Sequence, residues 1–358
     1  MSTNGVETTY FRRVSRWKLL LIILTVVLVL TIVLSLNVGF AQIPFSTILQ
    51  ILAKRIPFLG SLIGPSNISY PEERIILEIR MPRILAGALV GAALSAAGVV
   101  YQGIFKNPMA DPYVLGVSAG AAVGASLAIV FGIGFTLFGV NTMPILAFAG
   151  SLVAVFIVYN ISRVGSRVPV TTLLLSGIAV SIFLSAIVAI LQVIAGKKLH
   201  AVVFWLMGGF SGVEWKDVWA ILPLIFIGTV IIYFFARDLN ILSLGEETAQ
   251  NLGVDVEKVK KVLLIFGSLV TAAAVSISGL IGFIGLMIPH ITRIMIGPDH
   301  RVLLPTSIIV GASFLVICDA VARVIVSPVE LPVGVITALS GGPFFIYLLR
   351  KKKESYGV

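Results

Sequence analysis

Apolar runs of about twenty residues recur along the whole chain, and they constrain its fold more than any other feature. A helix needs roughly 20 mostly apolar residues to cross the hydrocarbon core of a bilayer. A window of that length finds candidate spans near residues 17–37, 84–104, 113–132, 142–161, 170–194, 217–236, 260–278, 280–296, 302–325 and 331–349. The sequence therefore predicts an all-α, polytopic membrane protein whose ten transmembrane helices form one bundle.

The composition favours a lipid bilayer as the solvent for this bundle. Of the 358 residues, 58% are hydrophobic and only 12% are charged, whereas a soluble domain averages about 25% charged residues. The formal net charge of +10 lies in short clusters between apolar runs. That pattern is typical of membrane topology and not of a nucleic-acid-binding face. We expect one transmembrane domain over residues 1–358 and no nucleic-acid partner.

The basic residues also predict the orientation. With ten spans, 17 of the 26 lysines and arginines fall on the side that holds both termini. They are Arg12, Arg13, Arg16, Lys18, Lys106, Arg163, Arg167, Arg237, Lys258, Lys260, Lys261, Arg293, Arg301, Arg350, Lys351, Lys352 and Lys353. Because cytoplasmic loops carry an excess of lysine and arginine, we expect a multi-pass protein of the cell (inner) membrane with both termini in the cytoplasm.

Two connecting segments are long enough to hold structure of their own. The segment 38–83 includes residues 46–55, an amphipathic pattern that predicts a short helix at the membrane surface.

A break between the seventh and eighth spans is expected at Ser276, Ser278 and Gly279.

The second long segment, 237–260, is polar and predicts two short helices. Ser243 and Glu246 have the spacing of a capping box. The helix that they open should stop at Gly253, since glycine tolerates the left-handed turn, and Asp255 can cap a second helix that runs into span seven. Because these two short helices are polar, they have no reason to enter lipid. We therefore expect them to contact a soluble partner.

Small residues recur every four positions in the second and third spans. Gly87 and Gly91 do so in one, and Gly116, Gly120 and Gly124 in the other. Because small residues let helix backbones approach closely where lipid offers no hydrophobic driving force, we interpret them as packing positions. A substrate pathway along these glycines is the alternative.

Charges inside the spans are few, and each costs roughly 2.5–3.5 kcal/mol at the bilayer centre on insertion scales. Asp319 and Arg323 lie four residues apart on one helix face and can pair, which would neutralise both and lock the bundle. Arg80 and Arg83 begin span two on the same side as Arg323. The alternative is that the three arginines form a docking surface for acidic groups of a partner.

The sequence contains no signature of catalysis. It has no phosphate-binding G-x-x-x-x-G-K-[ST] loop, no G-x-S-x-G elbow, no paired catalytic carboxylates and no metal-ligand spacing, and Cys318 is its one cysteine. We therefore expect a non-enzyme without catalytic residues, metal site or cofactor. A stand-alone secondary transporter or channel would need several inward-facing ionisable residues, and only Asp319 is clearly deep. A non-transporting membrane scaffold is a further alternative function for this chain.

Several longer motifs occur in a fixed order between residues 20 and 350. The most distinctive is Tyr101-Gln-Gly-Ile-Phe-Lys-Asn-Pro-Met-Ala-Asp-Pro-Tyr-Val-Leu-Gly-Val-Ser-Ala-Gly120. The others span residues 80–94, 205–215, 244–253, 285–293, 297–301 and 330–339. Together they resemble the FecCD-type permease family, the transmembrane subunits of ABC importers for iron–siderophore complexes, haem and cobalamin.

The resemblance implies a transmembrane permease that imports a metal chelate into the cytoplasm by alternating access. An iron–siderophore complex is the favoured cargo, with haem and cobalamin as alternatives. It also implies a homodimer, or a dimer with a close paralogue, two cytoplasmic ATPase subunits that hydrolyse the ATP, and an extracytoplasmic substrate-binding protein.

The resemblance also assigns roles to residues. The family's coupling helices match residues 242–260, where Leu244, Gly245, Glu246, Glu247 and Gly253 would contact the ATPase. Its docking arginines match Arg80, Arg83 and Arg323. Its cytoplasmic gate falls at Val170, Thr171 and Thr172, where Thr172 replaces the arginine of the cobalamin permease.

Overall fold

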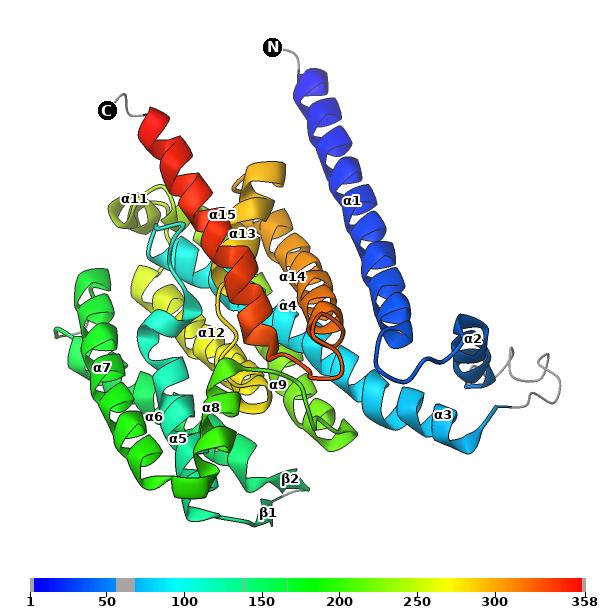
Figure 1. The fold of residues 1–358 in the computed structure, drawn as a ribbon. Helices are drawn as coiled ribbons and strands as arrows, with labels where there is room; N and C mark the ends of the chain where they lie inside the picture. Colours follow the sequence, from blue (N-terminus) through cyan, green and yellow to red (C-terminus); the bar gives the residue numbers. More distant parts are fainter. Residues whose placement is uncertain (1–2, 56–67, 138, 166, 356–358) are drawn as a thin grey trace.

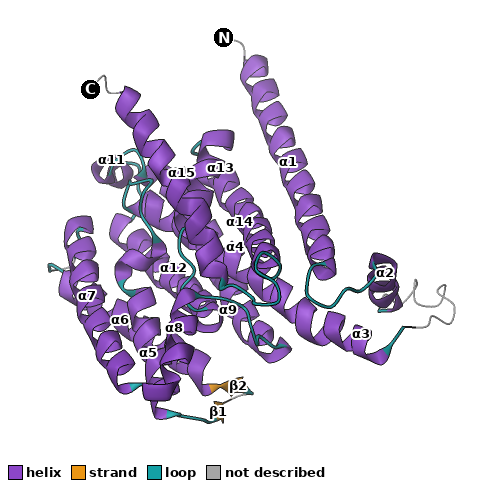
Figure 2. Ribbon diagram, viewed as in Figure 1, coloured by secondary structure: helices purple, strands orange, loops and turns teal. Residues whose placement is uncertain are grey.

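The computed structural model describes residues 3–55, 68–137, 139–165 and 167–355, with side chains between Ser15 and Arg350. Figure 2 shows that helices make up nearly all of this part of the chain, beside the small β1–β2 hairpin. The elements are α1 (Thr3–Asn37), α2 (Phe45–Lys54), α3 (Tyr70–Arg74), the π-helical η1 (Ile75–Arg80), α4 (Met81–Ile104), the 3₁₀ turn η2 (Pro112–Leu115), α5 (Val117–Phe131), β1 (Thr136–Leu137), β2 (Val140–Asn141), α6 (Thr142–Ser162), α7 (Val170–Ile194), the 3₁₀ turn η3 (Gly196–Lys198), α8 (Leu199–Met207), α9 (Trp215–Phe234), α10 (Ala236–Leu242), α11 (Glu246–Asn251), α12 (Val256–Ser278), α13 (Ile284–Ile296), α14 (His300–Ala322) and α15 (Val333–Ser355).

The long helices run side by side between two ends of one bundle. The start of α1, the end of α15 and the short α11 lie at the same end, which we call the termini end (Figure 1). The β1–β2 hairpin lies at the opposite end, which we call the hairpin end. The predicted all-α polytopic architecture is therefore confirmed.

Each of the ten predicted spans coincides with a helix, but two of these helices are short. Among the described residues, eight helices are long and apolar enough to cross a membrane. The exceptions are α5 with 15 residues and α13 with 13. At 1.5 Å per residue they span only about 20–22 Å, less than a hydrocarbon core of about 30 Å. The length criterion therefore confirms eight spans and leaves the count of ten open.

The break between the seventh and eighth spans lies where it is expected. Helix α12 ends at Ser278, Gly279 has a φ of +65°, and α13 begins at Ile284. Left-handed φ values of this kind strain residues with a Cβ. A substituent on Gly279 would also collide with the carbonyl oxygen of Trp205, so backbone geometry and space both require glycine.

Close helix packing uses the small residues that recur every four positions. A Cβ atom on Gly91 of α4 would collide with the carbonyl oxygen of Gly311 of α14. One on Gly120 of α5 would meet Gly150 of α6, and one on Gly124 would meet Leu146. The packing interpretation of these glycines therefore agrees with the structure.

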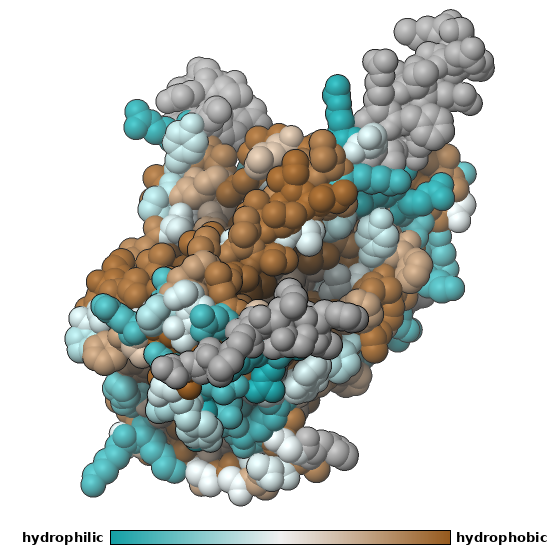
Figure 3. Space-filling model, turned by 90° about the vertical axis from the view of Figure 1, so that its right-hand side faces the viewer, coloured by the Kyte–Doolittle hydropathy of each residue, from teal (hydrophilic) through white to brown (hydrophobic). Residues whose placement is uncertain are grey.

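Burial differs strongly between the helices. In the continuous helix Tyr70–Ile104, which includes α4, 78% of the most apolar 18-residue stretch is buried. The corresponding shares are 67% in α12 and in α14 but only 11% in α1. The outward-facing side chains of α1 and α7 are mostly apolar; for example, Val193 is 84% exposed. Figure 3 shows apolar residues across the middle of the face that carries α1 and α2, with hydrophilic ones toward its lower edge. Such a surface requires lipid or protein around it.

The predicted surface helix at 46–55 is present as α2, Phe45–Lys54. Its buried residues Ile48 and Ile51 pack with Leu36 and Ile84 in a small satellite core. Residues 56–67 of the same segment lie outside the described residues. So do the side chains of Arg12, Arg13, Lys351, Lys352 and Lys353, which were counted in the orientation prediction.

Candidate functional site

A cluster of charged residues lies inside the bundle toward the hairpin end. Asp319 of α14 is 1% exposed and accepts a hydrogen bond from Arg83 Nε at 2.9 Å. Its other oxygen, Oδ2, lies 3.1 Å from Nε of Arg323. Arg83 also donates to Oε2 of Glu330 at 2.6 Å. The predicted Asp319–Arg323 pair is thus present, and it is part of a four-residue network that links α4, α14 and the segment before α15.

Two of the predicted docking arginines hold the end of α1 in place. Arg80 donates to the carbonyl oxygens of Leu36 at 2.7 Å and Ala41 at 2.5 Å. Arg323 donates to Val38 O at 2.6 Å and to Ser35 Oγ at 2.6 Å. Carbonyl groups at a helix end lack intrahelical donors, so these guanidinium groups satisfy acceptors that would otherwise be unpaired.

The structure brings Arg80, Arg83 and Arg323 together, as predicted, but turns them inward. They are 5%, 8% and 4% exposed, and each donates to groups of this chain. Glu330, whose side chain is 43% exposed, is the accessible member of the network. Sequence reasoning missed its role, although it opens the motif at 330–339. The arrangement supports locking of the bundle, and docking stays a prediction.

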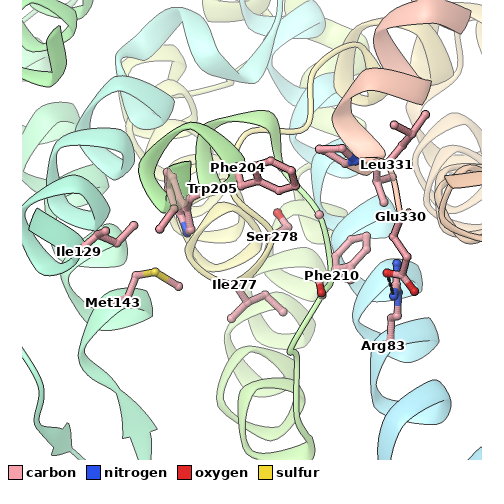
Figure 4. A pocket seen from close by; sticks show the side chains of 16 residues that line it. Arg83, Ile129, Met143, Phe204, Trp205, Phe210, Ile277, Ser278, Glu330 and Leu331 are labelled. Carbon is pink, nitrogen blue, oxygen red and sulfur yellow. Dashed lines mark hydrogen bonds and ion pairs between the residues drawn. The ribbon is translucent and has the colours of Figure 1, made fainter. Parts of the chain in front are cut away.

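A cavity of about 360 Å³ lies beside this network. Figure 4 shows Phe204, Trp205 and Phe210 around it, with the Arg83–Glu330 ion pair at one side. Its remaining wall comes from the last turns of α5 and α12 and from the first turns of α6 and α15. The motifs at 205–215 and 330–339 therefore meet around one cavity, which their separation in the sequence does not reveal.

Backbone contacts clamp the segments around the cavity. Gly209 N donates to Ser278 O at 2.7 Å, and Gly334 N donates to Gly208 O at 3.2 Å. Gly208 has a φ of +70°, and a Cβ there would collide with the carbonyl oxygen of Leu280. This close approach explains why the chain carries glycines between α8 and α9.

At the termini end, the capping-box prediction for Ser243 is wrong. Helix α10 continues to Leu242, and the Ser243 hydroxyl donates back to Asn240 O at 2.6 Å. The N-cap of α11 is instead Gly245, with a φ of +130° and no side-chain bond. The hydroxyl fails to cap because the preceding helix already supplies its partner.

Two structural predictions for this segment hold. Asp255 caps α12 by accepting from Lys258 N at 3.1 Å, and Gly253 is left-handed with a φ of +85°. Leu244 is 67% exposed and Glu247 is also exposed. Glu246 differs, because its Oε1 lies 2.8 Å from Nζ of Lys260. The sequence analysis used Lys260 only as one of the basic residues that predict the membrane orientation, and it did not predict this ion pair.

The predicted gate residues begin α7 at the termini end. Thr171 is exposed, whereas Thr172 donates through Oγ1 to both Ser162 O and Pro169 O at 2.9 Å. Thr172 therefore closes the connection between α6 and α7. Over the described residues, no group of three or more His, Cys, Asp or Glu side chains could hold a metal ion.

Residues 27–351 match the FecCD transport family. The chain is 48% identical to the cobalamin import system permease protein BtuC of Halobacterium salinarum, over 81% of this chain and 78% of that protein. It is 40% identical to the hemin transport system permease protein HmuU of Yersinia pestis, over 78% and 84% of the two chains. A solved structure of a metal-chelate type ABC transporter in an inward-facing conformation superposes with a TM-score of 0.79 at 34% identity, over 92% and 98% of the chains.

Proposed function

This chain belongs to the FecCD transport family and is a multi-pass membrane permease, and from that premise we propose that it imports a large metal chelate in an ATP-driven complex. Its partners in this proposal are a second permease chain, two cytoplasmic ATPase subunits and an extracytoplasmic binding protein. The termini end then faces the cytoplasm, in keeping with the excess of basic residues there.

One observation carries the ATP-driven mechanism. At the termini end, residues 242–260 include the short polar helix α11 (Glu246–Asn251), which is flanked by two exposed leucines, Leu244 at 67% and Leu252 at 60%. Exposed apolar side chains beside acidic ones suit a protein partner better than lipid. We assign the coupling contact to Leu244, Gly245, Glu246, Glu247 and Gly253.

The cavity near Arg83 supports a pathway shared by two subunits. Ligand pockets measure about 300–1,000 Å³, so 360 Å³ in one chain is small for a metal chelate. A homodimer, or a dimer with a close paralogue, would enclose a wider space. ATP-driven alternating access would then open this space to one side at a time, either toward the hairpin end or toward the gate at Val170, Thr171 and Thr172.

For the cargo, we predict only its chemical class, a metal chelate. The sequence favours an iron–siderophore complex, and the identities of 48% and 40% to cobalamin and haem permeases bring those two chelates into the same test. A secondary transporter is less well supported, because Asp319 is paired with two arginines and so is not available as an ion relay.

Uptake of labelled cobalamin, haem and a panel of ferric siderophores should be compared in cells with and without the gene. Selective loss of one ligand, restored by the intact gene, supports the importer and names its cargo. Equal uptake in strains that lack redundant importers would refute it. Proteoliposomes that import without ATP would support the secondary transporter instead.

A further inference from the structure

Lys260 and Glu257 form a physical link between α11 and the start of α7. Nζ of Lys260 lies 2.8 Å from Oε1 of Glu246, the first residue of α11, and 3.2 Å from Oε1 of Glu257. The second carboxylate oxygen of Glu257 accepts from the backbone N–H of Val168 at 3.1 Å. One carboxylate thus binds the ammonium group with one oxygen and the α6–α7 connection with the other.

The ammonium group at the centre of this link has little freedom. Lys260 is 4% exposed, so water cannot replace its partners. Glu246 and Glu257 have side chains 41% and 31% exposed and hold it between them. A buried charge with two carboxylate partners fixes their relative positions more strictly than an exposed ion pair does. The first residue of α11 is therefore pinned to the first turns of α12.

The connection that Glu257 binds is itself stiff. Val164 and Arg167 exchange backbone hydrogen bonds at 3.0 and 3.2 Å, which closes a tight turn. Val168 is 5% exposed, and Pro169 follows it with a φ of −64°. A proline ring fixes that angle, so the φ angle of Pro169 cannot change when the amide that Glu257 holds moves relative to Val170, where α7 begins.

We propose that Glu257 and Lys260 are positioning residues that transmit movement of α11 to the cytoplasmic gate at the start of α7. This inference rests on the proposed function, which places the ATPase contact on α11 and the gate at Val170, Thr171 and Thr172. Displacement of α11 carries Lys260 and Glu257 with it, and Glu257 displaces the Val168 amide two residues before the gate helix.

The test uses the full complex in proteoliposomes, with the ATPase and binding-protein subunits that co-purify with the chain. Import of radiolabelled cyanocobalamin and ferrichrome is measured per ATP hydrolysed. A fluorophore on Val164→Cys, a 61% exposed position of the turn, reports its movement on addition of ATP and vanadate. Cys318→Ser, at the one other cysteine, removes background labelling.

Glu257→Ala should lower import per ATP about tenfold or more, since it removes a hydrogen bond and an ion pair, and should abolish the fluorescence change. Glu257→Gln keeps one carbonyl oxygen for the Val168 amide but turns an NH2 donor toward the Lys260 ammonium, so it should also lose most of both signals. Lys260→Met should behave like Glu257→Ala. Lys261→Met, at the exposed neighbouring lysine, is the matched control and should stay at wild-type values.

Wild-type coupling in Glu257→Ala would overturn the link while leaving the proposed function intact. Loss of ATPase subunits from Glu257→Ala would also overturn it, because the residue would then maintain the ATPase contact and not transmit its movement. A wild-type complex that binds no ATPase and imports neither probe would refute the proposed function itself.

Discussion

Arg83 and Asp319 are 236 positions apart in the sequence, yet they form a buried ion pair in which Arg83 Nε lies 2.9 Å from Asp319 Oδ1. Arg323 shares the same carboxylate. The pairing joins α4 to α14, two of the most buried helices of the bundle. The ion pairs also limit the roles of Arg83 and Arg323, because a guanidinium group that binds a carboxylate inside the bundle is not a free charge on the surface.

Asp319→Asn should destabilise the purified permease by about 3–5 kcal/mol, because it leaves two buried arginines without their shared anion. Thermal unfolding in detergent measures the effect. Glu330→Gln is the matched control. Its side chain is 43% exposed, so the cost there should be at most about 1 kcal/mol. Equal losses for both variants would contradict a locking role for Asp319.

Charge reversal of Arg80 and Arg83 should weaken docking of the binding protein, as the docking proposal requires. Because both side chains are buried, affinity must be measured on the folded, monodisperse fraction, with thermal unfolding in parallel. Arg74→Glu, an exposed site with a side chain 56% accessible, serves as the control. Unchanged affinity accompanied by a lower melting temperature would remove the arginines from the interface and leave them a structural role.

Glu247→Lys should reduce association with the ATPase subunits and uncouple hydrolysis from uptake. This variant tests the contact more cleanly than Glu246→Lys, which would also place a second ammonium group beside buried Lys260. We expect Glu246→Lys to uncouple as well, but with a lower melting temperature. Normal uptake by both variants would count against the coupling assignment of α11.

Gly91→Ala should destabilise the bundle by about 1–3 kcal/mol, the usual cost of overpacking, since its new Cβ meets the carbonyl oxygen of Gly311. Gly342→Ala in α15 is the matched control, because nothing lies within 4 Å of a Cβ there. It should be neutral or slightly stabilising. Indistinguishable melting temperatures for the two variants would show that α4 and α14 can separate without cost.

Asp299, which caps α14 outside the span, should make stability depend on pH. Its hydrogen bond from Arg301 is the main cause that holds the pKa of this carboxyl below its usual value. A depressed pKa contributes stability above the unfolded pKa of about 3.9, and this stability is lost as the pH falls. The melting-temperature difference between wild type and Asp299→Asn should therefore be constant at neutral pH and shrink below about pH 4. A difference that grows on acidification would contradict this origin.

Much of the fold could be predicted because helix formation in lipid is a local requirement. Backbone groups in a bilayer must pair within their own helix, so each apolar run indicates a span, and Gly279 and Asp255 mark boundaries. Ser243 shows where local reasoning ends. Its hydroxyl had two competing partners close in sequence, and the length of α10 decided between them.

The sequence by itself determined which long apolar segments form helices, which residues allow close packing and which family the motifs resemble, but not the short helices α3, α8 and α10. Only the tertiary structure decided the partners of the charges: Arg83 with Asp319 and Glu330, and Lys260 with Glu246 and Glu257. The physical reason is range. Backbone hydrogen bonding acts over a few residues, whereas a buried charge must find whatever opposite charge the packing of distant helices brings within about 3–4 Å.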